Sequence, residues 1–342
     1  MKNLIHIYYI LLITSLIISC KKNNEVNAVT KESIVYVVGH ETKVGGLAKF
    51  WKNGRDTVLS SKNSFASSVF VSGSDIYIAG QEFNGSKYVA TLWKNGVATS
   101  LSNGSNSVQA YSVFVYRSDV YVSGFDIIGT PATEVATIWK NGVATRLSNG
   151  RALSVFVSGS DVYAAGYEFN SSTNRNVATV WKNGVATKLT DARYEGQANS
   201  IFVSGSDVYV VGWEWWTPMG NLGKIWKNGV VSILTNGTTI NHRPSSVFVS
   251  GSDVYVVGQS TLSISGSVLA TLWKNGTATN LTDGLRSASA QSIFVRGSDV
   301  YVVGIEQNDA RTRYLAKVWK NGVASALTDG GNEVVASCVY VK

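Results

Sequence analysis

A four-residue motif, Trp-Lys-Asn-Gly, recurs seven times along this chain, and its spacing restricts the fold more than any other feature. Successive motifs stand 42 to 47 residues apart, with tryptophans at Trp51, Trp93, Trp139, Trp181, Trp226, Trp273 and Trp319. A period of this length is typical of repeats that cannot bury their apolar faces alone and stack side by side. The sequence therefore predicts seven similar units.

Each unit has the pattern of four short strands, named a, b, c and d in chain order. In the unit at 246–282, SVFV and DVYVVG are joined at Gly251-Ser252, and LW and TAT are joined across Asn275-Gly276. Both dipeptides favour tight hairpin turns because Gly and Asn tolerate positive φ. The runs are apolar on successive residues, which predicts sheets buried on both faces between neighbouring units.

The two chain ends are out of phase with the repeat. The first strand pattern, SIVYVVG at 33–39, matches strand b, and the last, ASCVYV at 336–341, matches strand a. Seven complete units exist only if the C-terminal strand pairs with the N-terminal unit, which would leave no open sheet edge between the chain ends. The prediction is an all-β, seven-bladed β-propeller with four antiparallel strands per blade, closed by that pairing.

The N-terminal segment predicts export. Residues 1–19 contain one lysine, an apolar run and small residues before Cys20, the layout of a signal peptide. Ile17-Ile18-Ser19-Cys20 resembles the lipobox of bacterial lipoproteins, which implies a lipid on Cys20. With Lys21 next to it, the resemblance implies anchoring in the outer membrane. The alternative is an ordinary signal with an incidental cysteine. Residues 20–32 read as a polar tether, and 33–342 as the propeller.

The repeat region resembles highly repetitive β-propeller lipoproteins of bacteria. It lacks the Gly-His/Trp-Asp pair of WD repeats and the double glycine of kelch repeats, so the resemblance implies a fold and a location but no activity. The formal charge of +8 includes seven lysines from the repeated motif, so it is spread around the molecule and does not predict nucleic-acid binding. The chain is expected to be a monomer that meets the membrane only through its lipid, without a cofactor.

The a–b and c–d turns are nearly identical from unit to unit and should share one face. Aspartates that begin strand b are expected to pair there with the lysines of the Trp-Lys-Asn-Gly motif, as at Asp75, Asp119, Asp161, Asp207, Asp253 and Asp299. Two interpretations are open. The charges form a docking ring for a partner, or the two turn sequences recur only because they form stable turns in each copy of the repeat.

The b–c and d–a stretches differ between units and should form the opposite face. One feature persists there: an acid two residues after the strand-b glycine, at Glu41, Glu82, Asp126, Glu168, Glu214 and Glu306, with Ser260 as the exception. These acids stand too far from the axis to share one metal ion. Each is expected to bind backbone N–H groups or a lysine of its own blade.

The segment Gly212–Pro218 is unusually rich in tryptophan. Because Pro218 follows closely, it is predicted to be a loop that exposes three indoles, and exposed aromatic area is typical of an interaction site. Phe125 and Tyr167 occupy the equivalent of Trp213 in two other units. The alternative is a loop that caps its own blade. The candidate ligand-binding residues are Trp213, Glu214, Trp215, Trp216, Phe125, Tyr167 and Glu168.

The predicted function is a non-catalytic recognition module at the bacterial envelope, which binds a glycan or a protein through the b–c/d–a loops. Two alternatives stay open: a carbohydrate-active enzyme using acids such as Glu168 and Glu214, or a structural scaffold. No catalytic residue and no metal ligand is predicted, because after the signal only His40 and His242 remain, in expected loops.

Overall fold

The computed structural model describes residues 33–42, 45–216, 220–235, 239–262 and 266–342. The chain divides into two compact parts, Met1–Glu32 and Ser33–Lys342. The predicted signal peptide, Cys20 and the tether belong to the first part and lie outside the described residues. The described part is all-β, and it contains no helix long and apolar enough to span a membrane.

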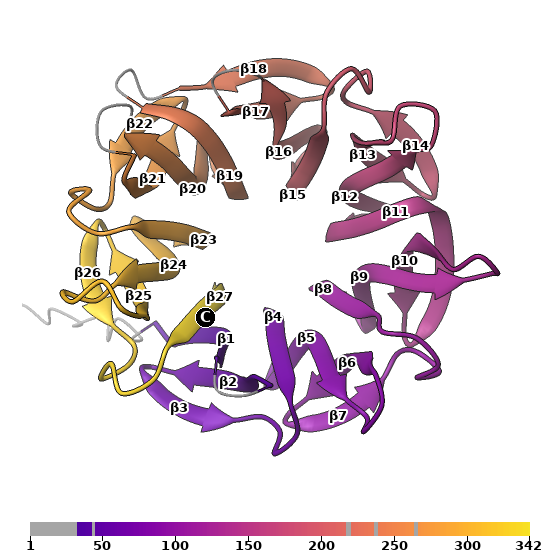
Figure 1. Cartoon of the computed structure of the whole chain (residues 1–342), viewed down its shortest axis with the longest axis horizontal. Coiled ribbons are helices and arrows are strands. Elements are labelled where there is room, and N and C mark those ends of the chain that lie inside the picture. Colours follow the sequence, from indigo (N-terminus) through magenta and orange to yellow (C-terminus); the bar gives the residue numbers. More distant parts are fainter. Residues whose placement is uncertain (1–32, 43–44, 217–219, 236–238, 263–265) are drawn as a thin grey trace, which may run out of the picture. The chain divides into compact units, whose positions relative to one another are not determined.

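The strands assemble into antiparallel sheets in which sheet order follows chain order, except that the last strand, β27, joins the first sheet. Five sheets have four strands each, in the orders β27-β1-β2-β3, β4-β5-β6-β7, β15-β16-β17-β18, β19-β20-β21-β22 and β23-β24-β25-β26. The sixth runs β14-β13-β12-β11-β10-β9-β8. Figure 1 shows the sheets of Ser33–Lys342 side by side around a centre; each has one innermost strand except the seven-stranded sheet, which has two, β8 and β11.

The strand bounds follow the four predicted positions. The innermost strands are β4 (Ser64–Ser72), β8 (Gln109–Tyr116), β11 (Val143–Ser158), β15 (Gly196–Ser204), β19 (Thr239–Ser250), β23 (Ala288–Arg296) and β27 (Val334–Val341). The second strands are β1 (Val35–Glu41), β5 (Asp75–Phe83), β9 (Asp119–Ile128), β12 (Asp161–Asn170), β16 (Asp207–Trp216), β20 (Asp253–Leu262) and β24 (Asp299–Gln307). The third strands are β2 (Leu47–Lys52), β6 (Tyr88–Lys94), β10 (Thr133–Lys140), β13 (Arg175–Lys182), β17 (Gly220–Lys227), β21 (Val268–Lys274) and β25 (Tyr314–Lys320). The outermost are β3 (Arg55–Val58), β7 (Val97–Ser100), β14 (Val185–Lys188), β18 (Val230–Leu234), β22 (Thr277–Asn280) and β26 (Val323–Ala326).

The seven-stranded sheet arises because one strand serves two units. The first part of β11 pairs with β10, as an outermost strand does, and its second part pairs with β12, as an innermost strand does. A loop was expected at this d–a connection. The connection from Trp139 to Ala152 is the shortest of the repeat, so it leaves no residues for a loop and the chain stays extended.

Both predicted hairpin turns are confirmed. At the a–b turn, Gly251 has φ of 59°, and at the c–d turn Asn275 and Gly276 have φ of 51° and 82°. Positive φ at these central residues gives the turn the twist of the flanking strands. The same Asn and Gly angles recur at every Trp-Lys-Asn-Gly motif, which explains why this dipeptide is invariant among the copies.

The predicted pairing of the chain ends is present. Strand β27 pairs antiparallel with β1, and the register joins Val37 to Val339 and Tyr36 to Tyr340. In Figure 1 the yellow C-terminal strand lies beside the indigo β1. The first sheet is therefore built from both ends of Ser33–Lys342.

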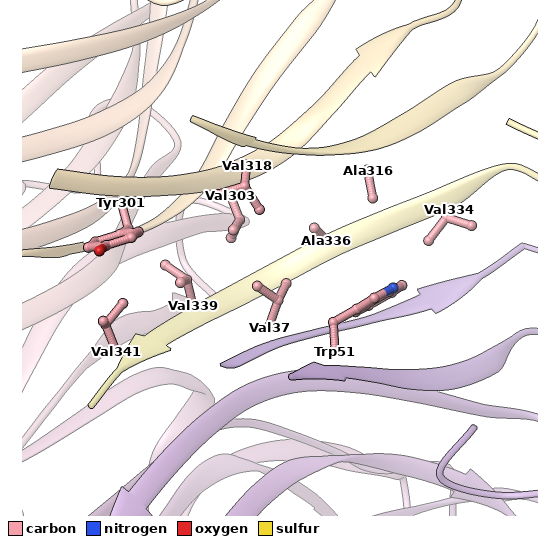
Figure 2. Close-up of a cluster of buried hydrophobic side chains, with 10 residues drawn as sticks. All are labelled: Val37, Trp51, Tyr301, Val303, Ala316, Val318, Val334, Ala336, Val339 and Val341. Atoms are coloured by element: carbon pink, nitrogen blue, oxygen red, sulfur yellow. The ribbon is translucent and has the colours of Figure 1, made fainter. Parts of the chain in front are cut away.

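The core lies between neighbouring sheets, as the continuous apolar runs predict. Figure 2 shows one such cluster, in which Val37 and Trp51 of the first sheet pack with Val339 of β27 and with Val303 and Ala316 of the preceding sheet. The seven repeat tryptophans are each at most 2% exposed. They fill the wedge between sheets, where large buried side chains contribute most to stability.

Candidate functional site

A β-bulge interrupts each innermost strand at the same place. In β4, Ala66 pairs with Gly80 and Ser68 pairs with Ala79, so Ser67 is left without a partner. The equivalent bulged residues are Tyr111, Leu153, Asn199, Ser245, Gln291 and Ser337. A bulge bends the strand and re-aims the extra side chain.

The glycine of VYVVG makes this bulge possible. A Cβ on Gly80 would stand 2.0 Å from the carbonyl oxygen of Phe65, and the equivalent glycines have the same clash at 1.8 to 2.3 Å. None of these glycines needs a positive φ. The invariant glycine is therefore required for close backbone approach.

Three positions next to the bulge vary strongly among otherwise similar strands. The bulged residue varies from serine to tyrosine. The other two positions form cross-strand pairs: the residue two positions before the bulged residue, and the residue after the strand-b glycine. These pairs are Val335–His40, Phe65–Gln81, Gln109–Phe125, Arg151–Tyr167, Gln197–Trp213, Arg243–Gln259 and Ser289–Ile305. These strands are otherwise similar in all seven units, and the variation is confined to the positions around the bulge. Such variation indicates residues whose identity the fold does not require.

Several of these side chains line one pocket of about 380 Å³, here called the axial site. Its walls come from the innermost and second strands of four sheets. They contain amides, aromatic rings and aliphatic groups but no Asp, Glu, Lys or Arg. The lining residues are His40, Phe65, Ala66, Ser67, Gln81, Gln109, Tyr111, Leu153, Gln291, Val335 and Ser337.

His40 gives this site an unused polar atom. Its Nδ1 is buried and has no hydrogen-bond partner among the described residues, while its ring contacts Phe65 edge-on at 4.7 Å. Burial lowers the pKa of His40, so the imidazole is neutral at pH 7. A neutral imidazole can donate or accept one hydrogen bond to a ligand.

An arginine cluster borders the axial site. Arg151 Nε donates to Glu134 Oε2 at 2.7 Å, its Nη1 donates to Tyr111 Oη at 2.9 Å, and its guanidinium lies 4.3 Å from the centre of the Phe125 ring. The hydrogen bonds that Arg151 donates to Glu134 raise the pKa of Arg151, which stays charged. Burial raises the pKa of Tyr167 and of Tyr111, so both phenols remain protonated. The cluster fixes Tyr111 at the edge of the pocket.

The predicted tryptophan loop is wrong. Residues Asp207–Trp216 form β16, and Trp215 pairs with Asn221 and Trp216 with Gly220 of β17. The hairpin ladder continues past Glu214, so the proline does not prevent the strand. Trp213 is half-buried with the Arg243 guanidinium 5.2 Å from its ring, and Trp215 is 39% exposed. The side chain of Trp216 and all of Pro218 lie outside the described residues.

Phe125 and Tyr167, the equivalents of Trp213, do not extend an exposed aromatic surface either. Phe125 is 6% exposed and stacks on Tyr111 at 6.1 Å, and Tyr167 is half-buried beside Arg151. Both residues lie in second strands rather than in loops, because these strands extend beyond the glycine. The equivalence of Phe125, Tyr167 and Trp213 is correct, but the position faces the innermost strand.

The recurrent acids are mostly paired, as predicted. Lys49 Nζ lies 3.0 Å from Glu41, Lys62 Nζ 3.0 Å from Glu82, Arg146 2.9 Å from Asp126 and Lys317 3.2 Å from Glu306. Glu214, a candidate ligand residue, is 6% exposed and pairs with Lys224, and both line a pocket with Lys188, Asp191 and Tyr194. Glu168 is half-buried in β12. These acids lie in strands, and no cluster able to hold a metal is found in the described residues.

Two further expectations concern histidine and the hairpin face. His40 and His242 lie in β1 and β19 rather than in loops. The predicted aspartate–lysine pairs are confirmed at 2.7 to 2.9 Å, between Asp75 and Lys94 and at the five equivalent places. The motif asparagine donates to the same aspartate, as Asn95 does to Asp75 at 2.9 Å.

Comparisons with known proteins bear on the fold. No family model matches the sequence, and no similar sequence is found among curated proteins. The structure is similar to an acylaminoacyl peptidase of Pyrococcus horikoshii (TM-score 0.53, 15% identity, 87% of this chain and 51% of that one). It is also similar to a puromycin-hydrolyzing peptidase of Mycobacterium tuberculosis (TM-score 0.55, 10% identity, 82% and 49%). A third similar structure is the β-propeller domain of the Trilobed protease of Pyrococcus furiosus (TM-score 0.51, 14% identity, 88% and 96%).

These similarities correct the predicted function. The propellers that this chain resembles belong to peptidases, and the prediction of an envelope recognition module with a glycan- or protein-binding loop face is therefore withdrawn. The chain spans about half the length of the two peptidases. Whether the chain is an enzyme stays a prediction, because likeness at 10–15% identity shows the fold alone. The fold of this chain is a β-propeller.

Proposed function

We propose that this propeller binds peptide segments in the axial site and works together with a peptidase that performs the hydrolysis. The observation that carries the proposal is the chemistry of the axial-site walls: amides, hydroxyls and a neutral imidazole among aliphatic and aromatic groups, without formal charge. The structural similarity to peptidases and to a protease β-propeller domain supports the proposal that the chain works together with a peptidase.

The amide side chains match the peptide group. Gln81, Gln109 and Gln291 each offer a carbonyl acceptor and an NH2 donor, which are the two functions of a peptide bond. Phe65, Leu153 and Val335 lie between them and offer apolar contact to a peptide side chain. A concave pocket in which polar groups converge beside apolar contacts is a usual form of a small-ligand site. The volume of about 380 Å³ suits two or three residues.

The innermost edge adds backbone donors. The outer side of each innermost strand pairs with its second strand, so alternate N–H groups on the other side point away from the sheet. The N–H one residue after the serine already donates to a serine of the neighbouring strand, as Val113 N does to Ser68 Oγ, so only the other N–H groups can serve a peptide. An extended peptide uses such groups readily, because backbone hydrogen bonds do not depend on the peptide's sequence.

The test uses the full chain in detergent micelles and isothermal titration with a mixed set of tripeptides to hexapeptides. The chain itself supplies substitutions that its fold tolerates: Gln109→Val, as at Val335, and Gln81→Ile, as at Ile305. We expect the double variant to keep its Tm and to lose peptide affinity at least tenfold. Val97→Thr, which copies Thr277 on an outermost strand, is the matched control and should bind as the parent does. Absence of binding by the parent, or equal binding by the double variant, refutes the proposal.

A further inference from the structure

Two closed rings of side chains lie below the axial site. Along each innermost strand a serine follows the bulged residue, and an aromatic residue follows two positions later. At about 3.3 Å per residue, the aromatic level stands roughly 10 Å from the bulge, toward the a–b turns. The serines, here called the hydroxyl ring, are Ser68, Ser112, Ser154, Ser200, Ser246 and Ser292, with Cys338 in the seventh place. The aromatic ring consists of Phe70, Phe114, Phe156, Phe202, Phe248, Phe294 and Tyr340.

The hydroxyl ring links each innermost strand to the next. Ser68 Oγ accepts from Val113 N at 3.2 Å, and the same bond recurs from unit to unit at 3.2 to 3.4 Å. These N–H groups lie on the strand edge that has no partner strand, so the hydroxyl oxygens line the inner side of the sheets. For Ser112, Ser154, Ser200 and Ser246 the hydroxyl proton has no acceptor among the described residues. Each is available to donate to a ligand.

The aromatic ring forms the floor. Neighbouring ring centres are 4.5 to 5.1 Å apart around the full set, including Phe294 to Tyr340 and Tyr340 to Phe70. Six of the seven interplanar angles are 50 to 54°, which is close to one-seventh of a turn. An aromatic ring is wider than this spacing, so the rings cannot lie with their planes along the circle. They are therefore arranged like the blades of a fan around the axis, each with one edge pointing inward.

This geometry limits what can pass. Seven points about 4.9 Å apart on a circle lie roughly 5.6 Å from its centre, and ring half-width with hydrogen radius leaves an opening of about 2 Å radius. That admits water but not a peptide side chain. The edges of aromatic rings carry partial positive charge. The rings do not line the pocket itself, but Ser67 and Ser337 of its lining directly precede Ser68 and Cys338 of the hydroxyl ring. The aromatic ring therefore narrows the centre beyond this end of the axial site and favours an electron-rich group above it.

We infer that the axial site takes the C-terminal carboxylate of a peptide end-on, with the carboxylate held at the hydroxyl ring above the aromatic edges. This rests on the proposed function and names its substrate class. Hydroxyl donors and positive ring edges both favour an anion, and a blind pocket admits a chain end rather than a chain passing through. An N-terminal ammonium finds no carboxylate among the lining residues.

The experiment compares four forms of one bound peptide by titration against the full chain: free, C-terminally amidated, N-acetylated and backbone-cyclised. We expect amidation and cyclisation to weaken binding at least tenfold and N-acetylation to leave it unchanged. Equal binding of the free and amidated forms overturns this inference but leaves the proposed function standing. No binding of any form overturns both.

A variant pair tests the hydroxyl ring itself. Ser112→Cys/Ser154→Cys copies the residue that the chain already has at Cys338, so the fold has a precedent for it, while the thiol is a much weaker donor. We expect the variant to keep its Tm and to bind the free and amidated peptides alike. Ser325→Cys, on an outermost strand, is the matched control and should retain the preference. A retained carboxylate preference in the double variant refutes the role of the hydroxyl ring.

Discussion

The glycine of strand b is the residue whose replacement should reveal how the bulge is built. In Gly166→Ala, the new Cβ would stand 1.9 Å from the carbonyl oxygen of Arg151, while real Cβ contacts essentially never fall below 3.0 Å. The carbonyl must therefore move by more than 1 Å, although it lies in the backbone of β11 where that strand is paired with β12. The substitution adds one methyl group and no strain from φ, because Gly166 has no positive φ.

The cost follows from two contributions. Over-packing at a site that cannot relax costs about 1–3 kcal/mol, and weakening of one ladder hydrogen bond costs about 1 kcal/mol. The sum, about 2–4 kcal/mol, corresponds to a fall in Tm of roughly 4–8 °C for a domain of this size. Differential scanning fluorimetry of the full chain measures it.

Gly331→Ala is the matched control for this prediction. The same methyl group there would have its nearest neighbour at 3.4 Å, and Gly331 also has no positive φ. Its Tm should stay within about 1 °C of the parent or rise slightly, because alanine restricts the unfolded chain. A Gly166→Ala variant with an unchanged Tm would show that the bulge does not depend on close backbone approach.

Three further outcomes are expected. Hydrogen bonds from Asn95 and Lys94 lower the pKa of Asp75 below its ordinary 3.8, and the pKa values of the five equivalent aspartates are lowered by the equivalent pairs. The resulting stabilisation is complete above the unfolded-state pKa and is lost as pH falls through the lower folded-state pKa. The Tm should therefore be flat from pH 7 to about 5 and fall steeply below about 4. Arg151→Gln should lower the free energy of unfolding in urea by about 1–2 kcal/mol, because Glu134 and Tyr111 lose their partner, whereas Gln197→Val should change it by less than about 0.5 kcal/mol. If Cys20 carries a lipid, Cys20→Ser should abolish incorporation of labelled fatty acid and move the chain from the membrane to the soluble fraction.

Much of the fold follows from local signals in the sequence. The Asn-Gly turn needs positive φ at two successive residues, and only a few residue types allow it, so its recurrence marks hairpins directly. The out-of-phase ends predict the pairing of β27 with β1, because strands without a partner expose their edges. The aspartate–lysine pairs also follow, since both residues sit at fixed distances from the turns that bring them together.

The axial site was missed although its signals were present. The small residues before the bulge and the glycine opposite it recur in every unit, and between them stands one variable residue, such as Tyr111 or Leu153. The signal was that residues vary within strands that otherwise repeat, whereas variable loops are the more usual place for a binding site. The loop predicted at Trp213–Trp216 is wrong because β16 runs to Trp216, and the proline two residues later in the sequence does not exclude a strand before it.

The sequence by itself determined the strands, their turns, the buried tryptophans and the pairing of the chain ends, because each depends on properties of neighbouring residues or on the repeat period. Only the tertiary structure decided which side chains meet at the centre. Phe70 and Tyr340 are 270 residues apart and touch at 5.1 Å, and Ser67 and Gln291 line one pocket. Such contacts depend on the twist and packing of all the sheets together, and no local pattern encodes them.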